Sequence, residues 1–362
     1  IRDRERGLMK IKQRYCAIVL LISISLAMPL AAKDAKPPKI FDNPDEMQVT
    51  LSGPWQTIKR NLKKDAMYPV QLTYTGADGQ QHTIDAEVAP RGITRRLRVC
   101  KFPPLKIHFD KKEMKGTEFR GNKSLKLVTY CKVQEKYEQY YIKEFLIYRM
   151  YNLLTDYSFR VQPMMIEYKD SEKKNDSITR FGFLIEDIDD VAKRNDMEKL
   201  SVAKISFRDL DPASFSIFSV FQYMIGNLDW AALSGPKKDE CCHNSRLIGA
   251  GNDIAPKYGI PYDFDSSGLV NAHYAAPPEG LKVRSIRQRL YRGFCVYNDE
   301  IPQTIALFKG KEADILALVQ NNQHLTDRNR KDAVDYIEDF YEIINNPKLV
   351  ERNIIDKCRG PE

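Results

Sequence analysis

The part of this chain that most constrains its fold runs from residue 215 to residue 270, where an apolar helix leads into a carboxylate-rich loop. Asp211 can cap the helix, Pro212 fits its first turn, and large apolar side chains then repeat every three or four residues. Gly226 is expected to end the helix. The pattern therefore predicts a rigid buried helix that presents a group of polar side chains just beyond its end.

The polar residues after this helix are Asp229, Asn244, Asp263 and Asp265. Carboxylate and amide oxygens suit Mg²⁺ or Mn²⁺, and Mg²⁺ commonly takes one or two carboxylates together with phosphate oxygens. Asp and Asn are also frequent in turns for structural reasons alone. Their order favours chemistry, because an acid that serves as base, then a metal-binding amide and then a metal-binding acid is the order in kinase-type sites.

Six segments extend this pattern over residues 85–275. They read Arg-Gly-Ile-Thr-Arg-Arg at 91–96, Phe-Pro-Pro-Leu-Lys-Ile-His-Phe at 102–109, Lys-Glu-Phe-Leu-Ile-Tyr at 143–148, Phe-Leu-Ile-Glu-Asp-Ile-Asp at 183–189, Asn-Leu-Asp-Trp at 227–230 and Tyr-Asp-Phe-Asp at 262–265. In this order they resemble the spore-coat-protein-H (CotH) family of atypical kinases, in particular its secreted bacterial branch. The resemblance implies an α+β, two-lobed atypical protein-kinase-like fold, with a β-rich N-lobe over residues 44–190 and a mostly helical C-lobe over residues 191–362.

The resemblance also implies a nucleotide site. Lys106 is expected on the ATP phosphates with Glu144 orienting it, and Arg91, Arg95 and Glu186 are expected as further nucleotide-binding residues. The arginine segment would replace a G-x-G-x-x-G loop, which the sequence lacks, because guanidinium groups match phosphate oxygens. A charge run such as this one is also typical of a solvated face. Lys126, on a second strand-like segment, is the alternative to Lys106, and the alternative for Glu144 is an exposed place at the edge of its helix.

The resemblance also implies catalytic and metal-binding roles for the polar residues that follow the apolar helix. Asp229 is expected to be the catalytic base, Asn244 and Asp263 to bind the metal, and Asp265 to lie near it. The implied activity is transfer of the γ-phosphate of ATP to a protein or glycan hydroxyl. One departure concerns Asn244, because 15 positions separate it from Asp229, against five in the common kinase loop.

Two other functions fit the same residues. A catalytically inactive kinase-fold protein would serve as a binding or envelope-organising module, and export favours it because nucleoside triphosphates are scarce outside the cytoplasm. A metal-dependent hydrolase would use Asp229, Asp263 and Asp265, but it would leave Lys106 and Glu144 without a role.

The first residues point to export. Residues 1–8 are interpreted as an upstream extension, residues 9–32 as a signal peptide with a basic end and an apolar run, and residues 33–43 as a linker. The apolar run is shorter than a membrane span of about 20 residues, although an uncleaved anchor is the alternative. A periplasmic or secreted protein without a stable membrane span is expected.

The cysteines agree with export. Apart from Cys16 in the signal segment there are six, an even number that suggests disulfides in an oxidising compartment. Cys100 and Cys131 follow strand-like segments and are expected to pair, and Cys295 with Cys358 would then tie the tail to the domain. The adjacent residues 241 and 242 are not expected to bridge each other. A zinc site is the alternative, but the chain has no C-x-x-C spacing.

Composition sets two limits. With 362 residues, 43% of them hydrophobic and 29% charged, the chain can bury a substantial core. Residues 1–32 hold six basic and two acidic residues, so 51 of the 57 basic and 47 of the 49 acidic residues remain beyond them. A net charge near +4 gives no general electrostatic argument for nucleic acid as a partner.

Periodicity predicts the remaining elements. Alternating residues 47–51, 70–74 and 84–88 predict an antiparallel sheet, and residues 164–168 and 181–185 predict two further strands. Aromatic residues at three- and four-residue spacing predict a long helix over residues 134–154. A short connecting helix is expected over residues 192–198 and a tail helix over residues 328–345, whose apolar face is expected to pack on the large lobe.

Overall fold

The computed structural model describes residues 39–235 and 240–360, and residues Pro37–Glu362 form one compact unit. The expected extension and signal peptide, including Cys16, lie outside the described residues. Within those two described ranges, none of the helices has the length and apolar character needed to cross a membrane.

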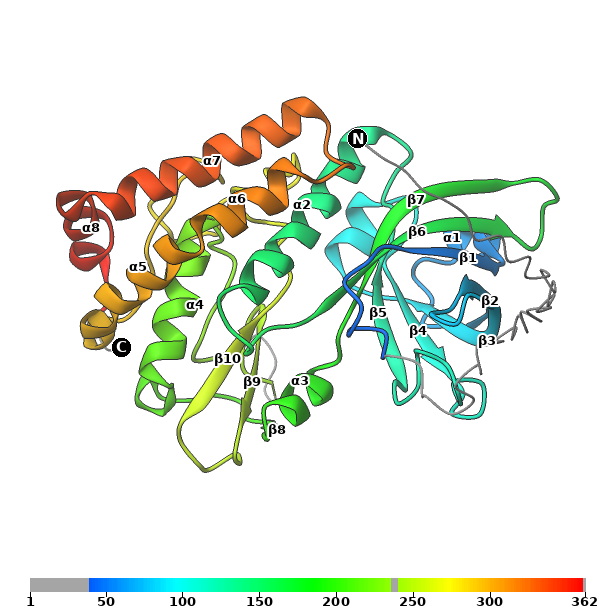
Figure 1. The fold of residues 1–362 in the computed structure, drawn as a ribbon, viewed down its shortest axis with the longest axis horizontal. Helices are drawn as coiled ribbons and strands as arrows, with labels where there is room; N and C mark the ends of the chain where they lie inside the picture. Colours follow the sequence, from blue (N-terminus) through cyan, green and yellow to red (C-terminus); the bar gives the residue numbers. More distant parts are fainter. Residues whose placement is uncertain (1–38, 236–239, 361–362) are drawn as a thin grey trace, which may run out of the picture. The chain divides into compact units, whose positions relative to one another are not determined.

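Seven strands form a closed barrel (Figure 1). Around the barrel their order is β1-β2-β3-β4-β5-β7-β6. Their bounds are β1 Met47–Gly53, β2 Tyr68–Thr75, β3 Gln81–Pro90, β4 Leu105–Phe109, β5 Ser124–Val128, β6 Val161–Asp170 and β7 Ser177–Ile185. The alternating pattern of residues 47–51, 70–74 and 84–88 is confirmed, because each of these segments is a strand with every second side chain buried.

The barrel closes through one parallel pair, between β1 and β6, with Met47 opposite Met164 and Gly53 opposite Asp170. All the other neighbouring strands are antiparallel. A ring of seven strands cannot alternate direction throughout, so at least one pair must be parallel. The expected two-lobed, atypical-kinase-like fold is wrong, because these strands close into a mixed parallel and antiparallel barrel. Residue alternation identifies strands, but it does not show which distant edge closes a sheet into a mixed barrel.

Aromatic side chains fill one end of the barrel. Phe102 stacks on Tyr130 with ring centroids 4.5 Å apart. Tyr168 meets both of these rings edge-on, and Trp55 meets the rings of Phe102 and Tyr168 edge-on. Trp55 begins α1, Trp55–Arg60, which lies between β1 and β2. Such edge-to-face and offset contacts add to the apolar burial that stabilises the barrel.

Helix α2, Glu135–Asn152, confirms the prediction of a long helix over residues 134–154. It packs against β6, β7 and α6, and most of its residues are buried, including Glu144 and Lys143. A helix that contacts a barrel on one side and another helix on the other has little surface left for solvent.

The remaining helices and strands follow β7. Helix α3 spans Ile188–Arg194, α4 Pro212–Met224, α5 Ile301–Gly310, α6 Glu312–Gln320, α7 Asp327–Asn345 and α8 Pro347–Asn353. A second sheet has the order β10-β9-β8, formed by Lys257–Pro261, Ser245–Gly249 and Glu198–Lys199. The tail helix was predicted within one residue. The connecting helix was expected over residues 192–198, but α3 starts earlier because Asp187 caps it through the Asp189 backbone N–H.

Within the described residues, disulfides join three pairs of cysteines. Cys100–Cys131 and Cys295–Cys358 are both bonded, which confirms these two predicted pairings. The expectation for residues 241 and 242 is wrong, because Cys241 and Cys242 bridge each other. The zinc alternative for these cysteines falls away, since all six are occupied as disulfides. Disulfides of this kind fit a protein of an oxidising compartment.

Candidate functional site

The end of α4 sets the position of Asp229. Asp211 caps this helix by accepting a hydrogen bond from the Ser214 N–H at 2.8 Å, as the sequence predicts. Gly226 leaves the helix with φ +63°, a conformation that favours glycine. Asn227 then accepts a hydrogen bond from the Asp229 N–H through its side-chain oxygen, at 3.1 Å. The carboxylate after the helix is therefore held by local hydrogen bonds.

Asp229 contacts both His243 and Asn244. Its Oδ1 lies 2.7 Å from His243 Nε2, and its Oδ2 accepts a hydrogen bond from Asn244 Nδ2 at 3.1 Å. Asn244 also donates to the Asp229 backbone carbonyl, at 2.7 Å. The long insert between Asp229 and Asn244 thus folds back and leaves the two side chains in contact. The hydrogen bond with His243 lowers the pKa of Asp229, and the same bond raises the pKa of His243.

The β9–β10 ladder brings Asn244 next to Asp263. Ser245 lies opposite Pro261 at its end, and just beyond it the Tyr262 N–H donates to the Asn244 carbonyl at 3.1 Å. Asn244 and Asp263 both have positive φ, +50° and +63°. The Asp263 N–H donates to the buried Tyr148 hydroxyl of α2 at 3.1 Å. Asp263 is exposed, and within the described ranges its carboxylate forms no hydrogen bond or ion pair.

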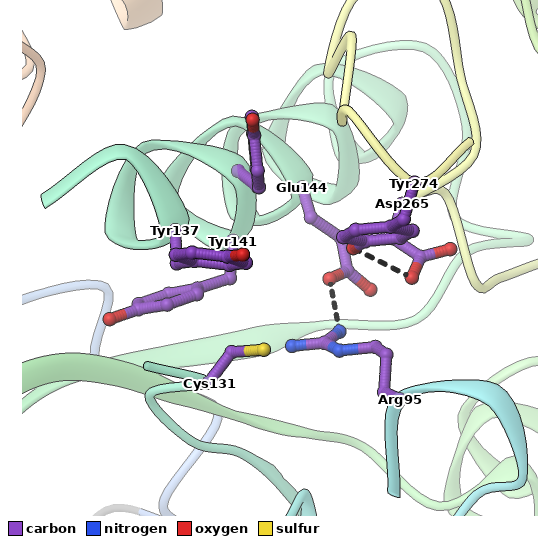
Figure 2. A pocket seen from close by; sticks show the side chains of 8 residues that line it. Arg95, Cys131, Tyr137, Tyr141, Glu144, Asp265 and Tyr274 are labelled. Carbon is purple, nitrogen blue, oxygen red and sulfur yellow. Dashed lines mark hydrogen bonds and ion pairs between the residues drawn. The ribbon is translucent and has the colours of Figure 1, made fainter. Parts of the chain in front are cut away.

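A second group of charges surrounds Glu144 of α2. Arg95 Nη1 donates to Glu144 Oε2 at 3.0 Å, and the Glu144 side chain is only 2% exposed. Tyr274 donates its hydroxyl hydrogen to Asp265 Oδ2 at 3.1 Å. Figure 2 shows the Arg95 guanidinium reaching toward Glu144, with Tyr274 above it and Asp265 beside it. These side chains, Cys131 and the tyrosines of α2 surround a gap that is too narrow to hold a water molecule.

The acids of this group hold protons more tightly than usual. Burial raises the pKa of Glu144 to about 7, because it outweighs the opposite effect of Arg95, and Asp265 and Asp263 add to the rise. Burial and the Asp263 charge raise the pKa of Asp265 to about 6. Removing water penalises the charged form of a carboxyl group, and neighbouring carboxylates penalise it further.

Two cations lie at the ring of Tyr262, next to Asp263, and the charge of Arg91 also acts on the Tyr262 hydroxyl. The Lys126 Nζ lies 5.1 Å and the Arg246 Cζ 5.3 Å from the centroid of this ring. Burial lowers the pKa of Lys126 to about 8, and repulsion from Arg91 and Arg246 adds to the shift. Arg91 donates its Nε–H to the Leu105 carbonyl at 3.1 Å. Arg246 pairs with Glu240 at 3.1 Å, so the positive charge that would attract an anion comes mainly from Lys126 and Arg91.

The charge of Asp263 shifts the pKa of residues around Asp229 and of residues around Glu144 and Lys126. It raises the pKa of His243, which contacts Asp229, and it also raises the pKa of Glu144. It acts likewise on the cations Arg91 and Lys126. Asp263 thus interacts electrostatically both with His243, which contacts Asp229, and with the residues Glu144, Arg91 and Lys126.

Three residues expected in the nucleotide site have other surroundings. Glu144 pairs with Arg95, and the side chain of Lys106 forms no hydrogen bond or ion pair within residues 39–235 and 240–360. Lys106 lies opposite Lys126 on the neighbouring strand. Glu186 is 5% exposed, accepts hydrogen bonds from Arg194 Nε at 3.2 Å and from the Arg160 N–H at 2.9 Å, and so helps to hold α3.

Sequence reasoning gave no role to His243, Arg246 or Tyr262. His243 could have been found because it directly precedes Asn244 in the sequence. Two adjacent residues in a turn can both contact the same carboxylate, here that of Asp229. The aromatic residue directly before Asp263 was the signal for Tyr262, but nothing in the sequence indicated that Lys126 and Arg246 flank its ring.

Metal binding would rest on few ligands. No group of three or more His, Cys, Asp or Glu side chains suited to a metal ion is found in the part of the chain that the structure describes. Asp263 offers an unpaired carboxylate, and the Asn244 amide oxygen remains open because its hydrogen bonds to Asp229 use the NH₂ group. This is a small oxygen set of the kind that Mg²⁺ completes with water and phosphate oxygens.

No family model matches this chain, and no curated protein matches it either. The resemblance to the CotH family therefore stays an expectation from the sequence.

Proposed function

We propose that this protein transfers the γ-phosphoryl group of ATP to a hydroxyl group, with a divalent cation at Asp263 and Asn244. The oxygen of the acceptor hydroxyl forms the new bond to phosphorus. Its proton passes to Asp229, and the bond between the γ-phosphorus and the bridging oxygen breaks, so ADP leaves with the electron pair. A protein or a glycan can supply the hydroxyl.

The observation that carries this proposal is the position of Asp263 between two groups. On one side Asp229 is held by His243 and Asn244, and on the other Lys126 and Arg91 supply positive charge. Phosphoryl transfer needs a proton acceptor and compensation of phosphate charge at the same place. The barrel is no obstacle, because function depends on the site and not on the fold that carries it.

The metal would neutralise charge on the phosphate oxygens. Asp263 and Asn244 fit as its protein ligands because both retain an unused oxygen. The chain's own residues do the rest: Asn244 orients Asp229 through its NH₂ group, and Lys126 and Arg91 attract the phosphates. The lowered pKa of Asp229 keeps it ionised and ready to accept a proton at neutral pH.

The nucleotide is placed on the open side of Asp263 rather than beside Glu144. The space at Arg95 and Glu144 is too narrow to hold even a water molecule, whereas pockets that enclose drug-sized ligands measure roughly 300 to 1,000 Å³. Arg95 and Glu144 then act as a buried support for the site. Their ion pair fixes α2, whose Tyr148 accepts the hydrogen bond from Asp263.

Thermal unfolding with and without MgATP or MnATP tests nucleotide binding. The wild-type protein and Asp229→Asn are expected to show a rise in Tm with the metal nucleotide, whereas Asp263→Ala is expected to lose it. Incubation with γ-³²P-labelled ATP then follows label into the chain itself, casein or a glycan. Asp229→Asn should lower transfer by a factor of about 10² or more.

The alternatives give different outcomes. Release of labelled inorganic phosphate without labelling of any acceptor would identify a hydrolase that uses Asp229, Asp263 and Asp265. A Tm that does not respond to metal and nucleotide at any concentration would leave a non-catalytic binding protein, and the proposal would fail.

A further inference from the structure

A groove of about 710 Å³ lies away from Asp263, along α2, α6 and the segment before β1. Buried or half-buried apolar side chains form much of its wall: Phe145, Leu146, Leu153, Pro163, Phe181, Ala317 and Leu318. Helices α2 and α6 are in contact, and the ribbon shows α6 running beside α2 (Figure 1). The volume falls in the range of roughly 300 to 1,000 Å³ that is usual for small-molecule pockets.

Arg149 is the polar centre of this groove. It is half-buried on α2, on the same face as Leu146 and Leu153, which lie three residues before it and four after it. Glu144 lies about 140° away around the helix, so the two sites use different faces of α2. Within residues 39–235 and 240–360, Arg149 forms no hydrogen bond or ion pair.

The surroundings of Arg149 leave its charge uncompensated. Burial lowers the pKa of Arg149, and no acid opposes this effect. The acids that line the groove do not pair with Arg149: Glu46 pairs with His324, Asp314 pairs with Lys311, and Asp45 is exposed to solvent. Burying part of a guanidinium group without a partner is unfavourable, because the group loses hydration. An anionic group that bound to it would offset this loss.

We propose that this groove binds a small amphiphilic monocarboxylate, with its carboxylate on Arg149 and its apolar chain along Phe145, Leu153 and Leu318. Arg149 supplies a planar fork of donors that matches a carboxylate. The three acids of the groove, Asp45, Glu46 and Asp314, disfavour ligands with several negative charges, such as nucleotides. The site is independent of the phosphoryl-transfer proposal.

Isothermal titration calorimetry of the full chain with octanoate, octan-1-ol and octylammonium tests this site, since the three probes share one chain and differ in charge. Octanoate is expected to bind at least about tenfold more tightly than octan-1-ol, because a hydrogen bond to a charged group contributes that much. Octylammonium is expected to bind more weakly than both. Equal affinities for octanoate and octan-1-ol would overturn the proposal.

Three variants locate the site. Arg149→Leu should reduce octanoate affinity to that of octan-1-ol, and Ala317→Trp, which fills the groove, should abolish binding of both. Arg328→Leu, on the exposed side of α7, is the matched control and should change neither. Octanoate binding that survives Ala317→Trp within twofold would place the ligand elsewhere and overturn the assignment, even if Arg149→Leu fails to fold.

Discussion

Arg95 and Glu144 form a buried ion pair, 3.0 Å from Nη1 to Oε2, and yet Glu144 holds its proton more tightly than an ordinary glutamate. The guanidinium favours the carboxylate, but burial and the charges of Asp263 and Asp265 favour the carboxylic acid more strongly. The pair is therefore a place where proton binding and folding are coupled.

Glu144→Gln is expected to gain stability relative to the wild type as the pH rises. In the folded protein the pKa of Glu144 is raised to about 7 from 4.5, so its contribution to stability is fully present below pH 4.5 and is lost as the pH rises toward 7. Glutamine mimics the acid form at every pH. The free energy of unfolding of the variant, minus that of the wild type, should rise by about 3 kcal/mol at most between pH 4 and pH 8.

Urea unfolding at several pH values measures this difference. Glu338→Gln, on the exposed side of α7, provides the control and should show no such rise. A difference that stays constant with pH, or that falls, would show that Arg95 dominates and that Glu144 is ionised throughout.

Lys126→Met is expected to weaken binding of MgATP at least about tenfold, because it removes a charged contact to phosphate. Lys106→Met is the matched control, since Lys106 lies directly opposite Lys126 on the next strand but outside the cluster around Tyr262. It should leave the affinity within about twofold of the wild type. The reverse result, measured by calorimetry, would restore Lys106 as the phosphate-binding lysine.

His243→Gln is expected to raise the pKa of Asp229, because the hydrogen bond from His243 is the main cause of its lowered value. Carbon-13 NMR of the labelled aspartate carboxyl group follows this titration without any assay of activity. If Asp229 is the base, the rate of phosphoryl transfer should begin to fall at a higher pH on the acidic side, by the same amount as the pKa shift. A shifted titration with an unmoved rate profile would assign proton transfer to another group.

Removal of one disulfide by the double substitution Cys295→Ser and Cys358→Ser is expected to destabilise the protein by about 4 kcal/mol, according to the loop-entropy model. The two cysteines are separated by 63 positions, so the bond restricts a long loop in the unfolded chain. Urea unfolding under non-reducing conditions measures the loss. A change below about 1 kcal/mol would show that packing alone holds the tail.

Much of the local structure could be predicted from the sequence. The long helix was predicted because aromatic residues repeat along it, and the Asp211 cap because the side chain precedes a proline and an apolar run. The pairing of Cys100 with Cys131 followed from two strand-like segments that each end at a cysteine. These features depend on residues close together in the chain or on simple alternation.

The long-range features could not be predicted in the same way. Closure of the barrel depends on β6 lying beside β1, and no local pattern specifies this partner. The partner of Glu144 was missed because Arg95 opens an irregular helical turn, Arg95–Val99, which directs it toward α2 in a way that strand alternation does not show. For Asp229, the contact with Asn244 depends on how the insert folds back.

The parallel pairing of β1 with β6 also bears on the order in which the molecule can assemble. Its first pair of partners, Met47 and Met164, are 117 positions apart, so during synthesis one side of β1 stays open until well over a hundred further residues have left the ribosome. An open strand edge invites pairing with other chains. Slow closure between distant segments prolongs that exposure, so the open edge of β1 is where a newly made chain can pair wrongly before β6 arrives.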